Sequence, residues 1–99
     1  MAYIKTLLAA QTAASTDTEF EINEDTQIPF GVSASGLDGV EELSIEFKDA
    51  DGGWVAISET LSVTNPRREL FGYGIWRVNK GVTLAAVLLS THQGNGRNY

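Results

Sequence analysis

The sequence predicts an all-β protein: a single antiparallel β-sandwich or small barrel of about seven to eight short strands, preceded by an extended N-terminal arm. Three observations lead to this prediction. Apolar and polar residues alternate over several short segments, as they do in strands with one buried face. Turn-forming Gly, Pro, Asn and Asp residues recur about every 8–12 residues, which is the spacing typical of sandwiches and barrels. No segment carries a convincing helical repeat.

The clearest element is a hairpin over residues 41–57. Leu43, Ile45 and Phe47 alternate with charged and polar residues, so the first strand has one apolar and one charged face. The segment 49–53, Asp-Ala-Asp-Gly-Gly, supplies turn residues, and the return strand follows it. As a calcium-binding loop, the same segment departs from the EF-hand pattern at three defining positions. The sequence therefore favours a turn over a calcium site.

The other strands are shorter. They are expected at residues 18–22, 26–34, 59–63, in two pieces within 69–78, and at 82–90, with a hairpin-type turn at 79–81. Pro29 cannot donate a hydrogen bond within a sheet, so the strand 26–34 should lie at a sheet edge or contain a bulge. The strand 82–90 is apolar on both faces, which places it either in the centre of the fold or under another subunit. Burial in the core is the favoured alternative.

The chain is expected to form one domain with two flanking segments. Residues 1–17 form an N-terminal arm or first strand, residues 18–90 the β-sandwich domain, and residues 91–99 a polar C-terminal tail. The apolar stretch 7–10 is too short for the core of a signal peptide, so we expect the first segment to belong to the mature protein. The residues expected in the core are Phe20, Ile22, Leu43, Ile45, Phe47, Ile57, Leu61, Val63, Trp76 and Val78.

Composition and charge indicate an ordinary folded domain with an acidic surface. Apolar residues make up 42% of the chain and charged residues 20%, and the net charge is −6. Twelve acidic residues and one base lie between positions 17 and 59, whereas five bases and one acid follow position 60. We favour solvated acidic strand faces as the explanation, and head-to-tail attraction between copies is the alternative. We expect no nucleic-acid partner and no membrane span.

The residues that carry chemistry are few. The chain has no cysteine, and its one histidine, His92, falls in the expected tail, where nothing would orient it as a general base. A zinc site is excluded, and we expect no cofactor, no metal and no enzymatic activity. Trp54, Tyr73 and Trp76 could stack on sugars, but aromatic residues at strand positions are more often found in cores or interfaces.

Several segments together resemble a group of small virion proteins of tailed bacteriophages. They are the opening Ala- and Thr-rich segment up to Phe20, the strand entry at 36–46, Lys-Asp-Ala-Asp-Gly-Gly-Trp-Val at 48–55, and Leu-Phe-Gly-Tyr-Gly-Ile-Trp-Arg-Val-Asn-Lys at 70–80, which an apolar strand follows. The resemblance extends over most of the chain from about residue 16 to residue 89. It implies a capsid decoration (cement) protein or a related accessory component of the head or tail.

On this resemblance we expect a structural protein on the capsid surface of the virion that binds and stabilises the outer head shell. A glycan-binding or other accessory module of the head or tail is the alternative. The expected partners are the major capsid protein and further copies of the chain, in a trimer by analogy with decoration proteins, or as a monomer or dimer that assembles only on the shell. The arm 2–16 is expected to contact the shell. The residues expected to contact partners are Tyr3, Ile4, Leu7, Leu8, Arg67, Arg68, Trp76 and Leu88.

Overall fold

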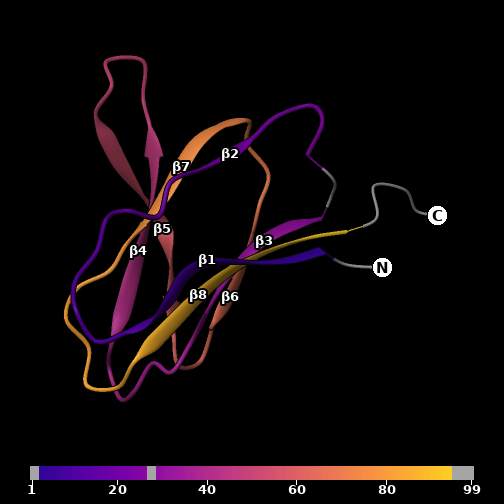
Figure 1. Ribbon diagram of the computed structural model, residues 1–99. Helices are drawn as coiled ribbons and strands as arrows, with labels where there is room; N and C mark the ends of the chain where they lie inside the picture. Colours follow the sequence, from indigo (N-terminus) through magenta and orange to yellow (C-terminus); the bar gives the residue numbers. More distant parts are fainter. Residues whose placement is uncertain (1–2, 27–28, 95–99) are drawn as a thin grey trace.

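Two antiparallel sheets of four strands each form a β-sandwich (Figure 1). The computed structural model describes residues 3–26 and 29–94. The strands are β1 (Tyr3–Gln11), β2 (Phe20–Ile22), β3 (Phe30–Ser35), β4 (Glu42–Lys48), β5 (Trp54–Ser62), β6 (Arg67–Leu70), β7 (Gly74–Asn79) and β8 (Val87–Gln93). The strand order is β1-β8-β3-β6 in the first sheet and β2-β7-β4-β5 in the second. The predicted all-β sandwich is confirmed, and none of the described residues forms a helix that could cross a membrane.

The predicted hairpin is formed by β4, β5 and the turn between them. In the turn, the backbone N–H of Asp49 donates to the carbonyl of Gly53. The Asp49 carboxylate accepts hydrogen bonds from the backbone N–H groups of Asp51 and Gly53, which closes the turn from inside. Gly52 has a φ of 84°, a conformation that favours glycine. The Asp-Ala-Asp-Gly-Gly segment is thus a turn whose first carboxylate binds its own backbone.

Two strand boundaries differ from the prediction because pairing between strands outweighs the local sequence signals for strand ends. The return strand does not stop at residue 57 and restart at 59. It is the continuous strand β5, and its register against β4 shifts between the pairs Ser44–Thr60 and Glu46–Ala56. The extra residues of this bulge break the alternation that suggested two strands. Pro29 lies just before β3, not within a strand, and β3 is an inner strand between β8 and β6.

The last strand begins and ends later than predicted. Residues 82–86 belong to the loop that precedes β8, while residues 91–93, assigned to the tail, complete β8. β8 is an inner strand between β1 and β3, so its apolar character reflects burial within the fold. His92 therefore lies in a strand, paired with Ile4 on one side and Gly31 on the other. The rest of the predicted tail, residues 95–99, lies outside the described residues.

The N-terminal segment forms a strand, not a free arm, over most of its length. β1 is the edge strand of the first sheet and pairs with β8 alone among the strands. Its register against β8 shifts twice, first between Thr6 and Leu8 and then between Leu8 and Gln11. Bulges of this kind twist an edge strand and blunt its tendency to pair with further strands. The first strand that the sequence allowed as an alternative to an arm is therefore present.

The core lies between the two sheets. Six of the expected core residues are buried, namely Ile22, Leu43, Ile45, Leu61, Trp76 and Val78, and three are partly buried against them, namely Phe20, Phe47 and Ile57. The prediction for Val63 is wrong, because this residue follows the end of β5 and is 48% exposed. Six further residues complete the core: Phe30, Val32 and Ala34 of β3, Leu70 of β6, and Val87 and Leu89 of β8.

Candidate functional site

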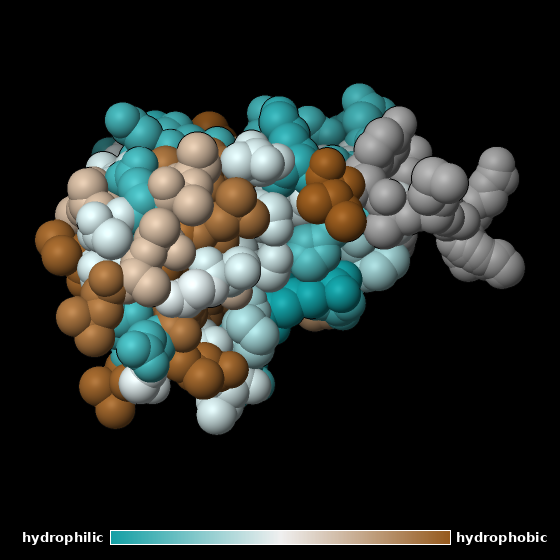
Figure 2. All heavy atoms as spheres, turned by 60° about the horizontal axis from the view of Figure 1, so that its bottom comes forward, coloured by the Kyte–Doolittle hydropathy of each residue, from teal (hydrophilic) through white to brown (hydrophobic). Residues whose placement is uncertain are grey.

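Four large aliphatic side chains project into solvent from loops at one end of the sandwich. Val40, Val82 and Leu84 are 97%, 79% and 82% exposed, and Val63 is 48% exposed. We call these four residues the apolar tip. They come from the β3–β4 loop, the end of β5 and the β7–β8 loop, which lie together at the bottom of Figure 1. Figure 2, in which this end comes forward, shows brown side chains gathered on one side of it. Exposed apolar groups gathered in this way mark interaction sites in soluble proteins.

Direct contacts hold the three loops of the apolar tip against one another. The backbone N–H of Leu84 donates to the Glu41 carboxylate at 2.8 Å, which joins the β7–β8 loop to the β3–β4 loop. The other oxygen of the Glu41 carboxylate accepts from the backbone N–H of Asp38 at 3.0 Å. Val40 and Val63 both line a shallow hollow of about 160 Å³ between the β3–β4 loop and the end of β5. The three loops are therefore adjacent at this end of the sandwich.

A buried lysine fixes the loop that displays Val82 and Leu84. Lys80 is only 1% exposed, and its ammonium group donates to the Ala13 carbonyl at 2.8 Å, the Gly81 carbonyl at 3.0 Å and the Thr83 hydroxyl at 3.1 Å. These three acceptors match the three hydrogens of an ammonium group. No carboxylate is among them, so neutral oxygens alone satisfy a buried charge.

The segment after β1 passes beside Lys80 and forms the other wall of its site. The backbones of Ser15 and Lys80 exchange two hydrogen bonds, of 2.9 and 3.0 Å. The Thr83 N–H donates to the Thr12 carbonyl at 3.0 Å. Burial lowers the pKa of Lys80 below its ordinary value, and the negative charge of Glu41 opposes this shift. The predicted turn at 79–81 is wrong, because β7 leads instead into a loop that backbone hydrogen bonds join to the N-terminal segment.

The charge around the apolar tip is negative. The three loops, residues 36–41, 63–66 and 80–86, carry Asp38 and Glu41, and the strands that adjoin them begin with Glu42 in β4 and with Arg67 in β6. Lys80 is the one base within the loops, and it is buried. The exposed surface of this end therefore combines aliphatic side chains with carboxylates.

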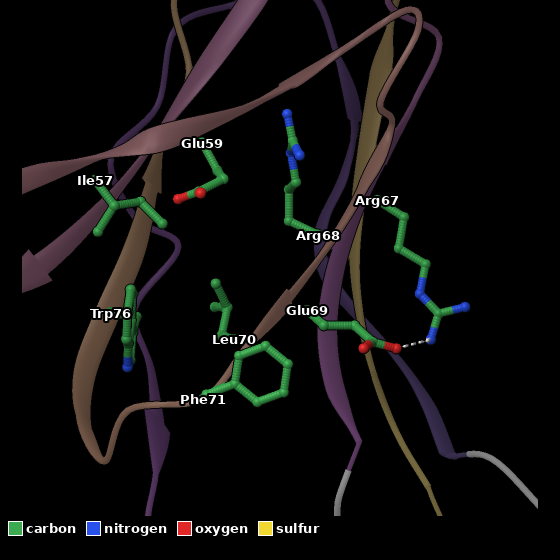
Figure 3. Close-up of a pocket in the computed structure, with 8 residues that line it drawn as sticks. All are labelled: Ile57, Glu59, Arg67, Arg68, Glu69, Leu70, Phe71 and Trp76. Carbon is green, nitrogen blue, oxygen red and sulfur yellow. Dashed lines mark ion pairs between the residues drawn. The ribbon is translucent and has the colours of Figure 1, made fainter.

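A groove opens on the side of the sandwich where the edges of the two sheets meet. Its volume is about 490 Å³, and its lining consists of Ile57, Glu59, Arg67, Arg68, Glu69, Leu70, Phe71 and Trp76. Figure 3 shows Ile57, Leu70 and Trp76 facing the groove, with Arg67 and Glu69 on the other side of β6. The Arg68 Nε donates to the Thr60 carbonyl at 2.9 Å and so links β6 to β5. The groove thus has an apolar floor and charges of both signs, which favour no particular ligand.

The structure does not bring the eight predicted partner-binding residues together. Tyr3, Ile4, Leu7 and Leu8 lie in β1, Arg67 and Arg68 in β6, Trp76 in β7 and Leu88 in β8. β1 and β6 are opposite edges of the first sheet. Trp76 is a core residue, 6% exposed, whose indole N–H donates to the Gly72 carbonyl, and Leu88 is half-buried. Only Arg67, Arg68 and Trp76 share a site, the groove between β5 and β6.

The three aromatic residues considered for sugar binding do not form one platform. The Arg77 guanidinium stacks on the Trp54 ring at 4.4 Å from the ring centroid and also binds the Glu46 carboxylate at 2.6 Å. Trp76, one residue before Arg77 in β7, points to the opposite face of the sheet and into the core. Tyr73 lies in the exposed loop before β7. One face of the Trp54 ring is thus covered by an arginine of the same chain.

His92 lies near the charged residues Arg67 and Glu69. Burial and the positive charge of Arg67 lower its pKa, and Glu69 opposes the shift. The described residues contain no group of three or more His, Asp or Glu side chains placed to hold a metal ion.

Comparison of the chain with protein-family models, curated proteins and solved structures gave no match.

Proposed function

We propose that this protein is a non-enzymatic structural protein of a tailed-phage virion, a decoration protein that binds the outer head shell and stabilises it. The observation that supports this proposal is the apolar tip, a rigidly held binding surface at one end of a small sandwich. The resemblance of residues 16–89 to phage virion proteins supports the choice of partner. In this proposal the partner is the major capsid protein, and several copies cluster around a symmetry axis as a trimer.

A surface of this kind suits repeated attachment to a large assembly. A shell offers many identical sites, so each contact can be weak while the occupied shell as a whole gains stability. Loops that are already ordered lose little conformational entropy on binding, and the Lys80 hydrogen bonds supply that order here.

The test is a binding experiment with purified protein and head shells that lack it. Co-sedimentation should show saturable binding, and the temperature at which shells disrupt should rise with occupancy. Shells that neither bind the protein nor gain stability from it would contradict the proposal. A screen of the isolated protein against immobilised glycans tests the alternative, since a sugar-binding module should bind glycans without any shell.

A further inference from the structure

We propose that the apolar tip is the surface that seats on the partner, and that its receptor is a protein surface with an apolar pocket bordered by Lys and Arg side chains. This inference rests on the proposed function and deepens it. It assigns the contact to the loop end of the sandwich, in place of the N-terminal arm that the sequence suggested. Residues 3–11 are engaged in β1 and are therefore not a free arm.

The aliphatic side chains define the centre of the contact. Val82 and Leu84 lie two positions apart on a loop that hydrogen bonds of Lys80, Thr83 and Glu41 hold in place. A loop held this firmly presents its apolar groups in one arrangement, which is the condition for complementarity with a pocket. These contacts hold the loop but do not cover Val82 or Leu84, which remain about four-fifths exposed in the single chain.

The carboxylates define the border of the contact and decide between possible occupants. Asp38 and Glu41 lie in the loops of the apolar tip and Glu42 adjoins them, and the exposed part of the three loops carries no base. A second copy docked tip to tip would bring these acids against their own equivalents, which is unfavourable. An anionic membrane would repel them in the same way. A protein surface with basic residues around an apolar pocket satisfies both features.

The topology also fixes the orientation of the bound protein. β4 runs from Glu42 beside the apolar tip to Lys48, so the turn 49–53 stands at the opposite end of the second sheet (Figure 1). With the tip on the shell, this hydrophilic turn points away from it. The orientation can be measured directly, because the chain contains no cysteine and single cysteines can be introduced at will.

The experiment compares Leu84→Cys with Ala50→Cys, a matched exposed site in the distal turn. Each variant is reacted with a maleimide, free and bound to shells that lack the protein. We expect shells to slow the labelling of Leu84→Cys at least tenfold and that of Ala50→Cys less than twofold. Protection of Ala50→Cys with free reaction of Leu84→Cys would overturn the inference while leaving shell binding, and so the proposed function, intact. If the protein does not bind shells at all, the proposed function fails as well.

A second set of variants measures affinity. Val82→Ser/Leu84→Ser should weaken shell binding at least tenfold, and raised salt should weaken the wild-type protein further because the carboxylate contacts are screened. Ile4→Ser, which removes an apolar side chain of similar exposure from β1, should change the affinity less than twofold. Equal loss in both variants would refute the inference. Two other results would also refute it. Disulfide-linked dimers of free Leu84→Cys that match the shell-bound arrangement would indicate that a second copy binds the tip. Binding of the protein to phosphatidylserine vesicles would indicate that a membrane binds it.

Discussion

Replacing Lys80 by methionine tests whether the buried ammonium holds the apolar tip in place. The substitution keeps the length and most of the volume of the side chain but removes three hydrogen bonds, to Ala13, Gly81 and Thr83. Hydrogen bonds from a charged donor contribute roughly 1.5–3 kcal/mol each, so their loss costs about 4.5–9 kcal/mol. Burying a charge costs several kcal/mol, which methionine does not incur. We therefore expect a net loss of roughly 2–4 kcal/mol in the free energy of unfolding.

Urea denaturation at pH 7 measures this loss, and Lys5→Met is the matched control. Lys5 is exposed, so its substitution should change the free energy of unfolding by less than about 0.5 kcal/mol. For a domain of this size, the expected loss in Lys80→Met corresponds to a fall of roughly 8–30 °C in Tm. If Lys80→Met is as stable as Lys5→Met, the ammonium hydrogen bonds contribute nothing, and the rigidity that we assign to the tip has no basis in Lys80.

The pH dependence of the same variant has a definite sign. Because burial lowers the pKa of Lys80 below 10.5, the unfolded chain binds more protons than the folded protein between the folded-state pKa and 10.5. The contribution of Lys80 to stability therefore increases as the pH rises through this window. The difference in free energy of unfolding between wild type and Lys80→Met should be larger near pH 10 than at pH 7. A difference that shrinks with rising pH would mean that the folded state favours the ammonium form.

Two further predictions concern the strands. Gly74→Ala should destabilise the protein by roughly 2–5 kcal/mol in thermal unfolding, because Gly74 has a φ of 141° and an added Cβ would lie 2.6 Å from the Phe47 ring. Gly81→Ala is the control: an added Cβ there has no atom within 4 Å, so the stability should change by less than about 0.5 kcal/mol. His92, the one histidine of the chain, should give a single NMR titration with a pKa below 6.5, and this pKa should rise in Arg67→Gln. Because the folded-state pKa is lowered, the contribution of His92 to stability should fall as the pH drops below 6.5, and a pKa above 6.5 would contradict this account.

The fold was predictable where local pattern and tertiary environment agree. The strand from Leu43 to Phe47 alternates cleanly because one of its faces packs on the core and the other meets solvent. The core residues of β3 were not predicted, because the environment that buries them is not local. In β3 both small and large residues are buried, since β8 and β6 flank it, and its sequence Phe-Gly-Val-Ser-Ala-Ser carries little alternation in polarity.

The candidate site was less predictable than the fold. Lys80 sits in Asn-Lys-Gly, which is typical of an exposed turn, and only contacts with a segment more than 60 residues earlier in the chain make it a buried structural group. Val82 and Leu84 read as part of an apolar strand, since exposed aliphatic residues and buried ones look the same in a sequence. Their exposure follows from the late start of β8 at Val87, which local pattern did not reveal.

The strand order has a consequence for the synthesis of the protein. Apart from β4 and β5, no two strands that are consecutive along the chain are neighbours in a sheet, and β1 pairs with β8, the last strand. β8 also separates β1 from β3, so the first sheet cannot assemble until residues 87–93 have left the ribosome. Until then β1 has no partner strand and one edge of β3 is unpaired. Sheets that depend on such distant pairings fold slowly. A chain that stops short of β8 would thus leave β1 without a partner strand and β3 with one open edge, and would be prone to aggregation.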